Sequence, residues 1–425
     1  MEKKYQSRMG KSKVAIMSLL WVLFGLCISP HLNAEARTSS PLEREIEAKL
    51  KQLNKPAVKT IKSEDGDIID CVNIYEQPAF DHPALKNHTI KEWNVQMMPD
   101  FLLESENSST GKIFQTWQKS GSCPKGTIPI RRILKEDLLR AASLERFGRK
   151  PPALFNNSTT LNFSIPNAGN SLFIPENRSS SYLVTLGYNY IGAQADINVW
   201  NPQVKMPDDF TTAQIWLKNS NNPYFESVES GWMVETSIAG WLILCMQLQR
   251  DSYRSTGCFD LTCSGFIQTG QVVLGGSIGP ISSPLGPQYE INVGIFLEPD
   301  SGNWYLKLNK NMGVGYWPAE ILGSLRQSAI LVEWGGQVSS TNIKKESPHT
   351  GTTMGSGDFA GGRYANACYM RNVRIKDYSL QLKYPDPVTA MADEPYCYSS
   401  LNEVKYGLEP VFYFGGPGRN PPYCP

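Results

Sequence analysis

The sequence predicts an all-β domain over residues 181–425, an antiparallel sandwich or barrel, preceded by a smaller mixed domain. From residue 181 onward, short segments of alternating apolar and polar residues follow one another with turn residues between them, such as ADINVW, YEINVGIFLE and GNWYLKL. No run of helices alternates with these segments, which is typical of an antiparallel sandwich or barrel. Charged residues make up only 19% of the chain, and this composition suits a secreted all-β protein better than a charge-rich helical one.

Residues 1–36 are predicted to be a secretory signal peptide. Basic residues precede the apolar run VAIMSLLWVLFGLCI, and the small residues Ala34 and Ala36 follow it. The alternative is a membrane anchor, but this run is shorter than the roughly 20 residues needed to span a bilayer. We therefore expect a secreted protein (extracellular, cell wall or vacuole) that has no membrane contact once the signal is removed.

Residues 37–145 form the predicted mixed domain. The segment SSPLEREIEAKLKQLNK begins a helix, because Ser40 caps it, Pro41 suits its first turn and Glu43 completes a capping box. Residues 146–180 are rich in Pro, Asn and Ser, which is the composition of a linker. The predicted order is therefore signal peptide 1–36, mixed domain 37–145, linker 146–180 and β-domain 181–425.

Charge and cysteine content narrow the chemistry. The formal net charge of +1 argues against a nucleic-acid partner, which would require a basic surface. Of nine cysteines, Cys27 leaves with the signal, and the even number that remains indicates disulfides formed in an oxidising compartment. Zinc would need clusters of Cys and His, but the chain has only four histidines, so we expect no metal and no other cofactor. N-glycosylation triplets begin at Asn87, Asn107, Asn156, Asn157, Asn162 and Asn177.

A carboxylate is the best catalytic candidate that the β-domain offers. Its only histidine is His349, and it contains neither G-x-S-x-G nor H-E-x-x-H. In SVESGWMV, strand alternation places Glu229 on the face opposite Trp232. In ILVEWGGQV, Glu333 and Gln337 share a face unless the two glycines between them insert a bulge. From the pattern alone, a glutamate on a strand is most often a solvated surface residue.

Several segments resemble the neprosin family of plant secreted glutamic peptidases. DGDIIDCVNIYEQPAFDHPALKNHTI and CPKGTIPIRR are similar to the family's activation peptide. The catalytic blocks are matched, in order, by VESGWMV, TGCFDLTCSGFIQT, GNWYLKL, VGYWPAEI, VEWGGQV, HTGTTMGSGDF and FYFGGPG. The resemblance implies a β-sandwich endopeptidase made as a zymogen, inhibited by its own propeptide. Its implied substrate is a proline-containing peptide or protein, cut after proline.

The resemblance places the two family catalytic glutamates on Glu229 and Gln337, so the second carboxylate is an amide here. Gln337 keeps a hydrogen-bond donor but loses the titratable proton. One hypothesis is an endopeptidase in which Glu229 is the general base and Gln337 holds the oxyanion, as in the fungal glutamic peptidases that work with a Glu and a Gln. The alternative is a catalytically silent relative that binds proline-rich peptide or cell-wall material through Trp232, Tyr316 and Trp317. The family's W-T-A-D-G-Y stretch has also become LQRDSY, residues 248–253.

The resemblance also implies disulfides and a processing step. The implied pairs are Cys71–Cys123, Cys258–Cys263 and Cys397–Cys424. Cys245 and Cys368 are left over, and either pair across neighbouring strands or remain buried thiols. If the protein is active, we expect cleavage in the linker between Arg146 and Asn177, with acid releasing the first domain by protonating carboxylates at the contact.

Overall fold

The structure is a computed structural model that describes residues 40–91, 114–141, 143–154, 160–162, 171–173, 175–220, 224–235, 243–254, 256–344 and 347–425. The predicted signal peptide lies outside these residues. Within them, no helix combines the length and the apolar character needed to cross a bilayer. Residues 46–425 form one compact unit.

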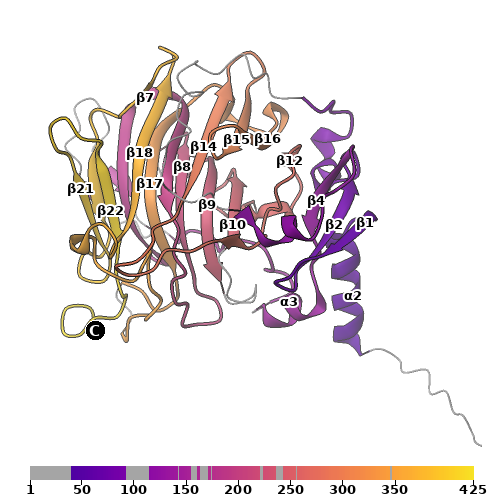
Figure 1. The fold of residues 1–425 in the computed structure, drawn as a ribbon, viewed down its shortest axis with the longest axis horizontal. Helices are drawn as coiled ribbons and strands as arrows, with labels where there is room; N and C mark the ends of the chain where they lie inside the picture. Colours follow the sequence, from indigo (N-terminus) through magenta and orange to yellow (C-terminus); the bar gives the residue numbers. More distant parts are fainter. Residues whose placement is uncertain are drawn as a thin grey trace, which may run out of the picture. The chain divides into compact units, whose positions relative to one another are not determined.

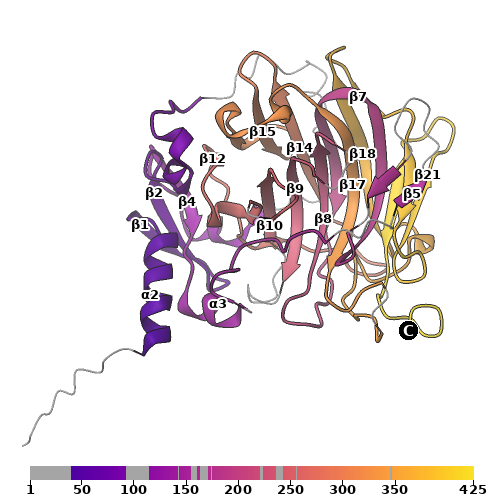
Figure 2. The same ribbon diagram turned by 180° about the vertical axis from the view of Figure 1, so that it is seen from behind.

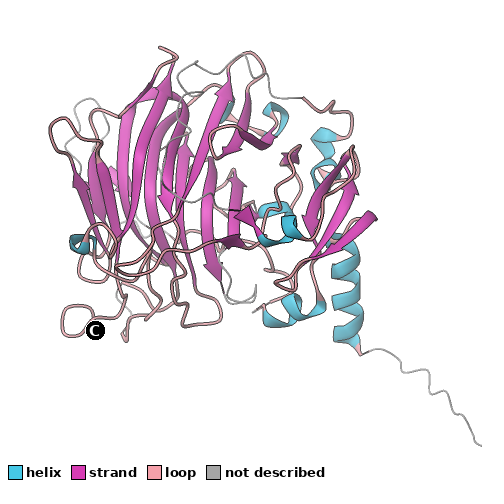
Figure 3. Ribbon diagram, in the orientation of Figure 1, coloured by secondary structure: helices cyan, strands magenta, loops and turns pink. Residues whose placement is uncertain are grey.

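The N-terminal region is mixed, as predicted. Its first helix, α2 (Pro41–Leu53), begins with the expected capping box, in which the backbone N–H of Glu43 donates to Ser40 Oγ (3.1 Å) and that of Ser40 donates to Glu43 Oε2 (3.0 Å). Three antiparallel strands, β1 (Ala57–Lys62), β2 (Ile68–Asn73) and β4 (Thr127–Arg131), form a sheet in the order β1-β2-β4. A second helix, α3 (Lys135–Arg140), follows (Figure 3).

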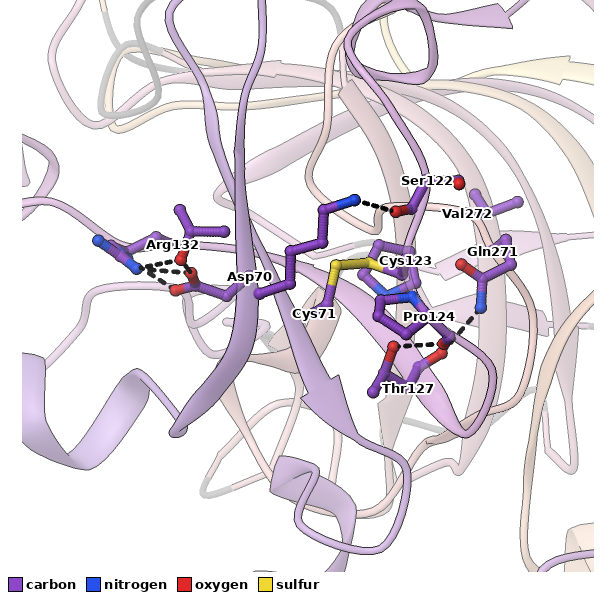
Figure 4. Close-up of a disulfide and its surroundings, with 12 residues drawn as sticks. Asp70, Cys71, Ser122, Cys123, Pro124, Thr127, Arg132, Gln271 and Val272 are labelled. Carbon is purple, nitrogen blue, oxygen red and sulfur yellow. Dashed lines mark hydrogen bonds and ion pairs between the residues drawn. A yellow bond between two sulfur atoms is a disulfide. The ribbon is translucent and has the colours of Figure 1, made fainter.

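The Cys71–Cys123 disulfide ties β2 to the loop before β4, next to a contact with the β-domain (Figure 4). On β2, Asp70 Oδ2 accepts a hydrogen bond from Arg132 Nε at 2.7 Å. From the β-domain, Gln271 Nε2 donates to the carbonyl of Thr127 at 2.8 Å. The disulfide therefore stabilises a part of the N-terminal region that is directly hydrogen-bonded to the β-domain.

The β-domain is built on one connected sheet of 15 antiparallel strands (Figures 1 and 2). Its main path runs β11-β10-β9-β8-β17-β7-β14-β15-β16-β12. The strands of this path are β7 (Arg178–Asn198), β8 (Phe210–Lys218), β9 (Ser227–Glu235), β10 (Ile243–Gln249), β11 (Cys258–Phe259), β12 (Ile267–Gln268), β14 (Glu290–Glu298), β15 (Asn303–Leu308), β16 (Met312–Trp317) and β17 (Ala329–Ser339). The others are β18 (Cys368–Asp377), β19 (Leu382–Lys383), β20 (Thr389–Ala392), β21 (Ser399–Glu403) and β22 (Val411–Gly415). Short two-stranded sheets pair β3 (Phe114–Gln115) with β13 (Ile278–Gly279), and β5 (Thr160–Asn162) with β6 (Ser171–Phe173).

The long strand β7 joins the parts of this sheet. Its first half pairs with β17 and β20, and its second half pairs with β14 and β18. One large hydrophobic core takes side chains from β7, β8, β9, β14 to β18 and β22, including Trp232, Trp304 and Trp334. The prediction of an all-β antiparallel β-domain is thus confirmed, and its strands form a single sheet continuous through β7 because that strand pairs with four others, β17, β20, β14 and β18.

The strand registers fix which side chains share the face that carries the candidate site. Glu229 on β9 lies opposite Trp216 on β8, and Trp216 lies opposite Glu333 on β17. Gln337 lies opposite Thr212. The β8–β17 pairing is unbroken from Leu331 to Ser339, so no bulge re-aims Gln337. Because opposed residues in an antiparallel pair project to the same side, Glu229 and Gln337 share one face of the sheet.

The predicted disulfides are present in the structure. They link Cys71 to Cys123, Cys258 to Cys263 and Cys397 to Cys424. Cys368 is a buried free thiol, whose Sγ lies 3.4 Å from the carbonyl oxygen of Asn198. Cys245 lies in β10 opposite Gly231, but its side chain is outside the described part of the chain.

Candidate active site

Glu229 is the centre of a buried polar cluster on β9. Its side chain is only 1% exposed. Oε2 accepts hydrogen bonds from Lys150 Nζ at 3.0 Å and from Gln214 Nε2 at 2.7 Å. Oε1 accepts hydrogen bonds from Ser227 Oγ at 2.6 Å and from the hydroxyl of Tyr253. The strand alternation that buries Trp232 in the core therefore turns Glu229 toward donors from three other segments.

The Lys150–Glu229 ion pair dominates the electrostatics of this cluster. Burial raises the pKa of Glu229, but the charge of Lys150 and hydrogen bonds from Ser227, Tyr253 and Lys150 outweigh burial, so the net pKa is lowered. Burial lowers the pKa of Lys150 to about 8, although the charge of Glu229 opposes that shift. The Lys150 side chain is 0% exposed. A buried pair of this kind is strongly destabilised when one partner loses its charge.

Lys150 reaches the cluster because its segment lies against the edge of the sheet. The backbone N–H of Lys150 donates to the carbonyl of Gly257 at 3.0 Å, and that of Phe259 donates to the carbonyl of Gly148 at 2.7 Å. Next to it, Ala153 donates to the carbonyl of Ser252 at 3.3 Å. Residues 148–153 thus follow the chain that carries Tyr253, and they bring an ammonium group from the predicted linker onto Glu229.

Tyr253 links Glu229 to a second buried cation. The guanidinium of Arg178 lies over the Tyr253 ring, 4.2 Å from its centroid. Arg178 Nη2 also donates to the carbonyl of Pro151. Burial and the charge of Glu229 raise the pKa of Tyr253 well above its ordinary value. The phenol therefore stays protonated and remains a hydrogen-bond donor to the carboxylate.

Gln337 occupies the other end of the same face. Its side chain is buried, and Nε2 donates to Ser180 Oγ on β7 at 3.0 Å. Its Oε1 has no hydrogen-bond partner among the described residues. No hydrogen bond in the described part of the chain joins Gln337 to Glu229, and strand β8 lies between their strands. Any joint action of the two groups would therefore go through a substrate or water between them.

Gln214 is the amide that lies between these two strands and touches Glu229. It is opposite Gly231 on β9 and Gly335 on β17. A Cβ on Gly231 would lie 2.0 Å from the carbonyl oxygen of Ala213, and one on Gly335 would lie 2.2 Å from that of Ser181. Both positions therefore require glycine, and Gln214 has no side chain beside it on either neighbouring strand.

Glu333 has its own partner and does not replace the missing carboxylate. Its Oε2 accepts a hydrogen bond from Lys218 Nζ at 2.6 Å. The unbroken register of β17 keeps Glu333 in the row of Trp216, four positions before Gln337. No shift of this strand therefore brings Glu333 to the position of Gln337, where the family has its second carboxylate.

The predicted aromatic binding residues need correction. Trp232 and Trp317 are fully buried members of the hydrophobic core. Trp232 lies on the face opposite Glu229 and donates through Nε1 to the carbonyl of Asn198 at 3.0 Å. The prediction that these two rings line a groove is therefore wrong, since the alternation of β9 and β16 turns them inward. Tyr316 is also buried, but its hydroxyl contacts the N-terminal region, at His88 Nε2 (2.9 Å) and the backbone N–H of Lys91 (2.9 Å).

His349 is a structural histidine. Its Nε2 lies 3.5 Å from Glu394 Oε2, and its Nδ1 lies 2.8 Å from the carbonyl oxygen of Thr350. It clusters with Cys397 and Cys424, but these cysteines are bonded to each other. Within the described residues, this is the one group with the composition of a metal site, and its thiols are not available as ligands.

Reasoning from sequence alone missed the residues that surround Glu229. These are Lys150, Arg178, Gln214, Ser227 and Tyr253. Two signals were available. Gln214 interrupts the apolar run of AQIWLKN, and Tyr253 is, with Asp251, one of the two residues that LQRDSY keeps from the family's W-T-A-D-G-Y stretch.

Two family models match the chain, and the chain is also similar to solved structures at low sequence identity. The Neprosin family model matches residues 207–417, and the Neprosin activation peptide model matches residues 60–171. Among solved structures, the chain is similar to Scytalido-glutamic peptidase with a peptide-based transition state analog, at 10% identity and a TM-score of 0.32, covering 56% of this chain and 97% of that one. SCP-B, a member of the Eqolisin family of peptidases in a complex with the tripeptide Ala-Ile-His, matches at 8% identity and a TM-score of 0.28, with the same two coverages. The two family models together cover most of the sequence, and the chain belongs to the neprosin family, with an activation peptide preceding the neprosin domain.

Proposed function

We propose that the chain is the secreted zymogen of a glutamic endopeptidase that cuts after proline, with Glu229 as its general base. The observation that carries the proposal is the buried Glu229 carboxylate, which four side-chain donors hold and which Lys150 of the linker neutralises. Removing a carboxylate and an ammonium group from water costs free energy. A fully buried pair of this kind is therefore a candidate for a functional site.

Peptide hydrolysis by this site would need Lys150 to leave. Glu229 would then take a proton from a water molecule whose oxygen attacks the scissile carbonyl carbon. The developing oxyanion would be held by the amide N–H₂ of Gln337, which still has one N–H beyond its bond to Ser180. Protonated Glu229 would finally deliver its proton to the leaving amine as the C–N bond breaks. Without Lys150, burial would still raise the pKa of Glu229 while the hydrogen bonds from Ser227 and Tyr253 would lower it, and Glu229 would act as a base only at a pH above that pKa.

Acid also provides the release step, and its sign follows from the shifted pKa of Glu229. A carboxylate whose pKa is lowered by folding stabilises the fold above its unfolded pKa, and that stabilisation is lost as the pH falls through the folded value. Protonation of Glu229 would leave the Lys150 ammonium buried without its counter-charge. The segment around Lys150 would then be expelled into solvent, which uncovers the site.

The function is tested by incubating the processed protein with a proline-rich peptide between about pH 2 and 6. Cleavage after proline supports the proposal. Cleavage only after other residues would support a peptidase but contradict the proposed specificity for proline. The replacement of a carboxylate by Gln337 favours a second candidate, the silent relative. That reading requires binding of the proline-rich peptide, measured by calorimetry, without any cleavage products by mass spectrometry.

Lys150→Ala is expected to remove the inhibition. In the full-length variant the Glu229 carboxylate has no ammonium partner, so processing should begin at a pH about one unit or more above that of the parent. The pH dependence of processing is measured by gel electrophoresis. Arg149→Ala is the matched control, since Arg149 is the exposed neighbouring cation and its loss should leave the processing pH unchanged. Equal behaviour of the two variants would contradict the role of Lys150.

The processing cut is expected on the C-terminal side of Lys150. A cut before Lys150 would leave the ammonium group attached to the β-domain through Pro151, whose carbonyl oxygen is held by Arg178. The cut should therefore fall between Pro151 and Asn177, in the later part of the predicted linker. N-terminal sequencing of the acid-treated protein checks this, and an active form that still begins before Lys150 would rule it out.

A further inference from the structure

A buried carboxyl, Asp393, lies in the same row of the sheet as Gln337. Ala392 at the end of β20 is opposite Ser181 on β7, so Asp393 comes next to Ser180. The backbone N–H of Asp393 donates to the carbonyl of Ser180 at 2.9 Å, and that of Ser180 donates to Asp393 Oδ2 at 3.0 Å. Ser180 is in turn opposite Gln337 and accepts its amide N–H at 3.0 Å. Asp393, Ser180 and Gln337 are therefore connected through two hydrogen bonds.

Asp393 is held in an environment that is unusual for a charged carboxylate. Its side chain is 2% exposed, and Oδ1 has no hydrogen-bond partner among the described residues. The facing cation is Lys344, whose Nζ is 4.0 Å away and donates to the carbonyl of Pro175. Three other titratable groups interact with its charge. The charges of Glu394 and Glu333 raise the pKa of Asp393, and the charge of Asp393 raises the pKa of Tyr182.

These surroundings set the protonation state of Asp393. Burial raises the pKa of Asp393 to about 6, helped by the charges of Glu394 and Glu333, while Lys344 and the N–H of Ser180 oppose the rise. At the acid pH expected for a glutamic peptidase, Asp393 is therefore neutral. As the pH rises through about 6, a negative charge appears beside Ser180.

We propose that Asp393 is a positioning residue of the active site, which acts through Ser180 and must be neutral for an oxyanion to form at Gln337. This inference rests on the proposed peptidase function. Two strand spacings separate Asp393 from Gln337, so a buried charge would lie roughly 10 Å from the oxyanion. Repulsion between the two charges at that distance corresponds to about a tenfold loss of rate. Asp393 thus restores a titratable carboxyl to the end of the site where Gln337 lacks one.

The activity test uses Asp393→Asn, which keeps the acceptor for Ser180 and cannot ionise. The pH profile of kcat/KM is measured on the acid-processed parent and variant with a proline-rich peptide. The parent should lose about tenfold in kcat/KM between pH 5 and 7 through Asp393, and the variant should retain that activity. Glu394→Gln is the matched control, because Glu394 is the adjacent carboxylate paired with His349. A purely structural role of Asp393 would lower activity equally at every pH, which would overturn the inference.

A second test reads the relay without activity. The side-chain amide resonances of Gln337, assigned by their loss in Gln337→Ala, are followed by nitrogen-15 NMR of the full-length protein across pH 5 to 7.5. They should titrate in the parent with a midpoint near the pKa of about 6 of Asp393, titrate with a lower midpoint in Glu394→Gln, which lacks one of the charges that raise that pKa, and not titrate in Asp393→Asn. Resonances that do not titrate, or that titrate alike in all three proteins, would disprove the relay. An inactive parent with the expected titration would instead reject the proposed function alone.

Discussion

Glu229→Gln should abolish peptide cleavage, with a loss of at least about 10²-fold in kcat. The amide keeps the size of the side chain and an oxygen that can accept hydrogen bonds from Ser227 and Tyr253. It cannot take a proton from water, so the general-base step is lost while the shape of the site remains. The measurement is kcat on the processed variant with a proline-rich peptide, with circular dichroism to show that the fold is retained.

Glu333→Gln is the matched control for that experiment. Glu333 is in the same row as Glu229 across β8, on the same face, and is paired with Lys218. Its loss should leave kcat close to that of the parent, because Glu333 is held by Lys218 and no hydrogen bond among the described residues joins it to Glu229. An equal loss in both variants would mean that the two carboxylates act together, and the assignment of Glu229 as the sole base would be abandoned.

The parts of the fold with local signals were predictable from the sequence. The capping box Ser40–Glu43 predicted the start of α2 because both partners lie within one turn. Strand alternation predicted that Trp232 and Glu229 lie on opposite faces of β9, and the register confirms it. The joining of the strands through β7 was not predictable, since it depends on pairings between segments more than a hundred residues apart, such as Val184 with Glu333.

The candidate site was predictable only at the positions that a family motif marks. Glu229 could be named from E-S-G-W, and the amide at Gln337 from W-G-G-Q. Lys150 could not be identified in this way. It lies 79 positions before its ion-pair partner Glu229, and nothing in its local sequence indicates that the two residues meet in the fold. The prediction that aromatic rings line a groove failed for a related reason. Proximity to a motif does not show which face of the strand a tryptophan occupies. The alternation of side chains along β9 does show it, and it places Trp232 in the buried core.

Gln337→Ala should reduce kcat by roughly 10²–10³-fold if its amide holds the oxyanion. Ser180 Oγ accepts one N–H of Gln337, and the other is the donor that the alanine variant loses. Gln337→Glu should instead raise activity at acid pH. The new carboxyl restores a titratable partner and adds an acid limb to the pH profile, because it must share the site with Glu229. Both variants are compared with the parent in kcat and KM across the acid range.

The contrast with Gln214 decides which amide belongs to the mechanism. Gln214 Nε2 contacts Glu229 Oε2 directly at 2.7 Å, whereas Gln337 contacts Ser180. If Gln337→Ala cleaves as fast as the parent while Gln214→Ala is impaired, the working pair is Glu229 with Gln214, and Gln337 is a bystander. If neither the parent nor Gln337→Glu cleaves the peptide but both bind it, the fold has kept a binding surface without the reaction. Cleavage by Gln337→Glu alone would show that this one amide separates a silent protein from an active one.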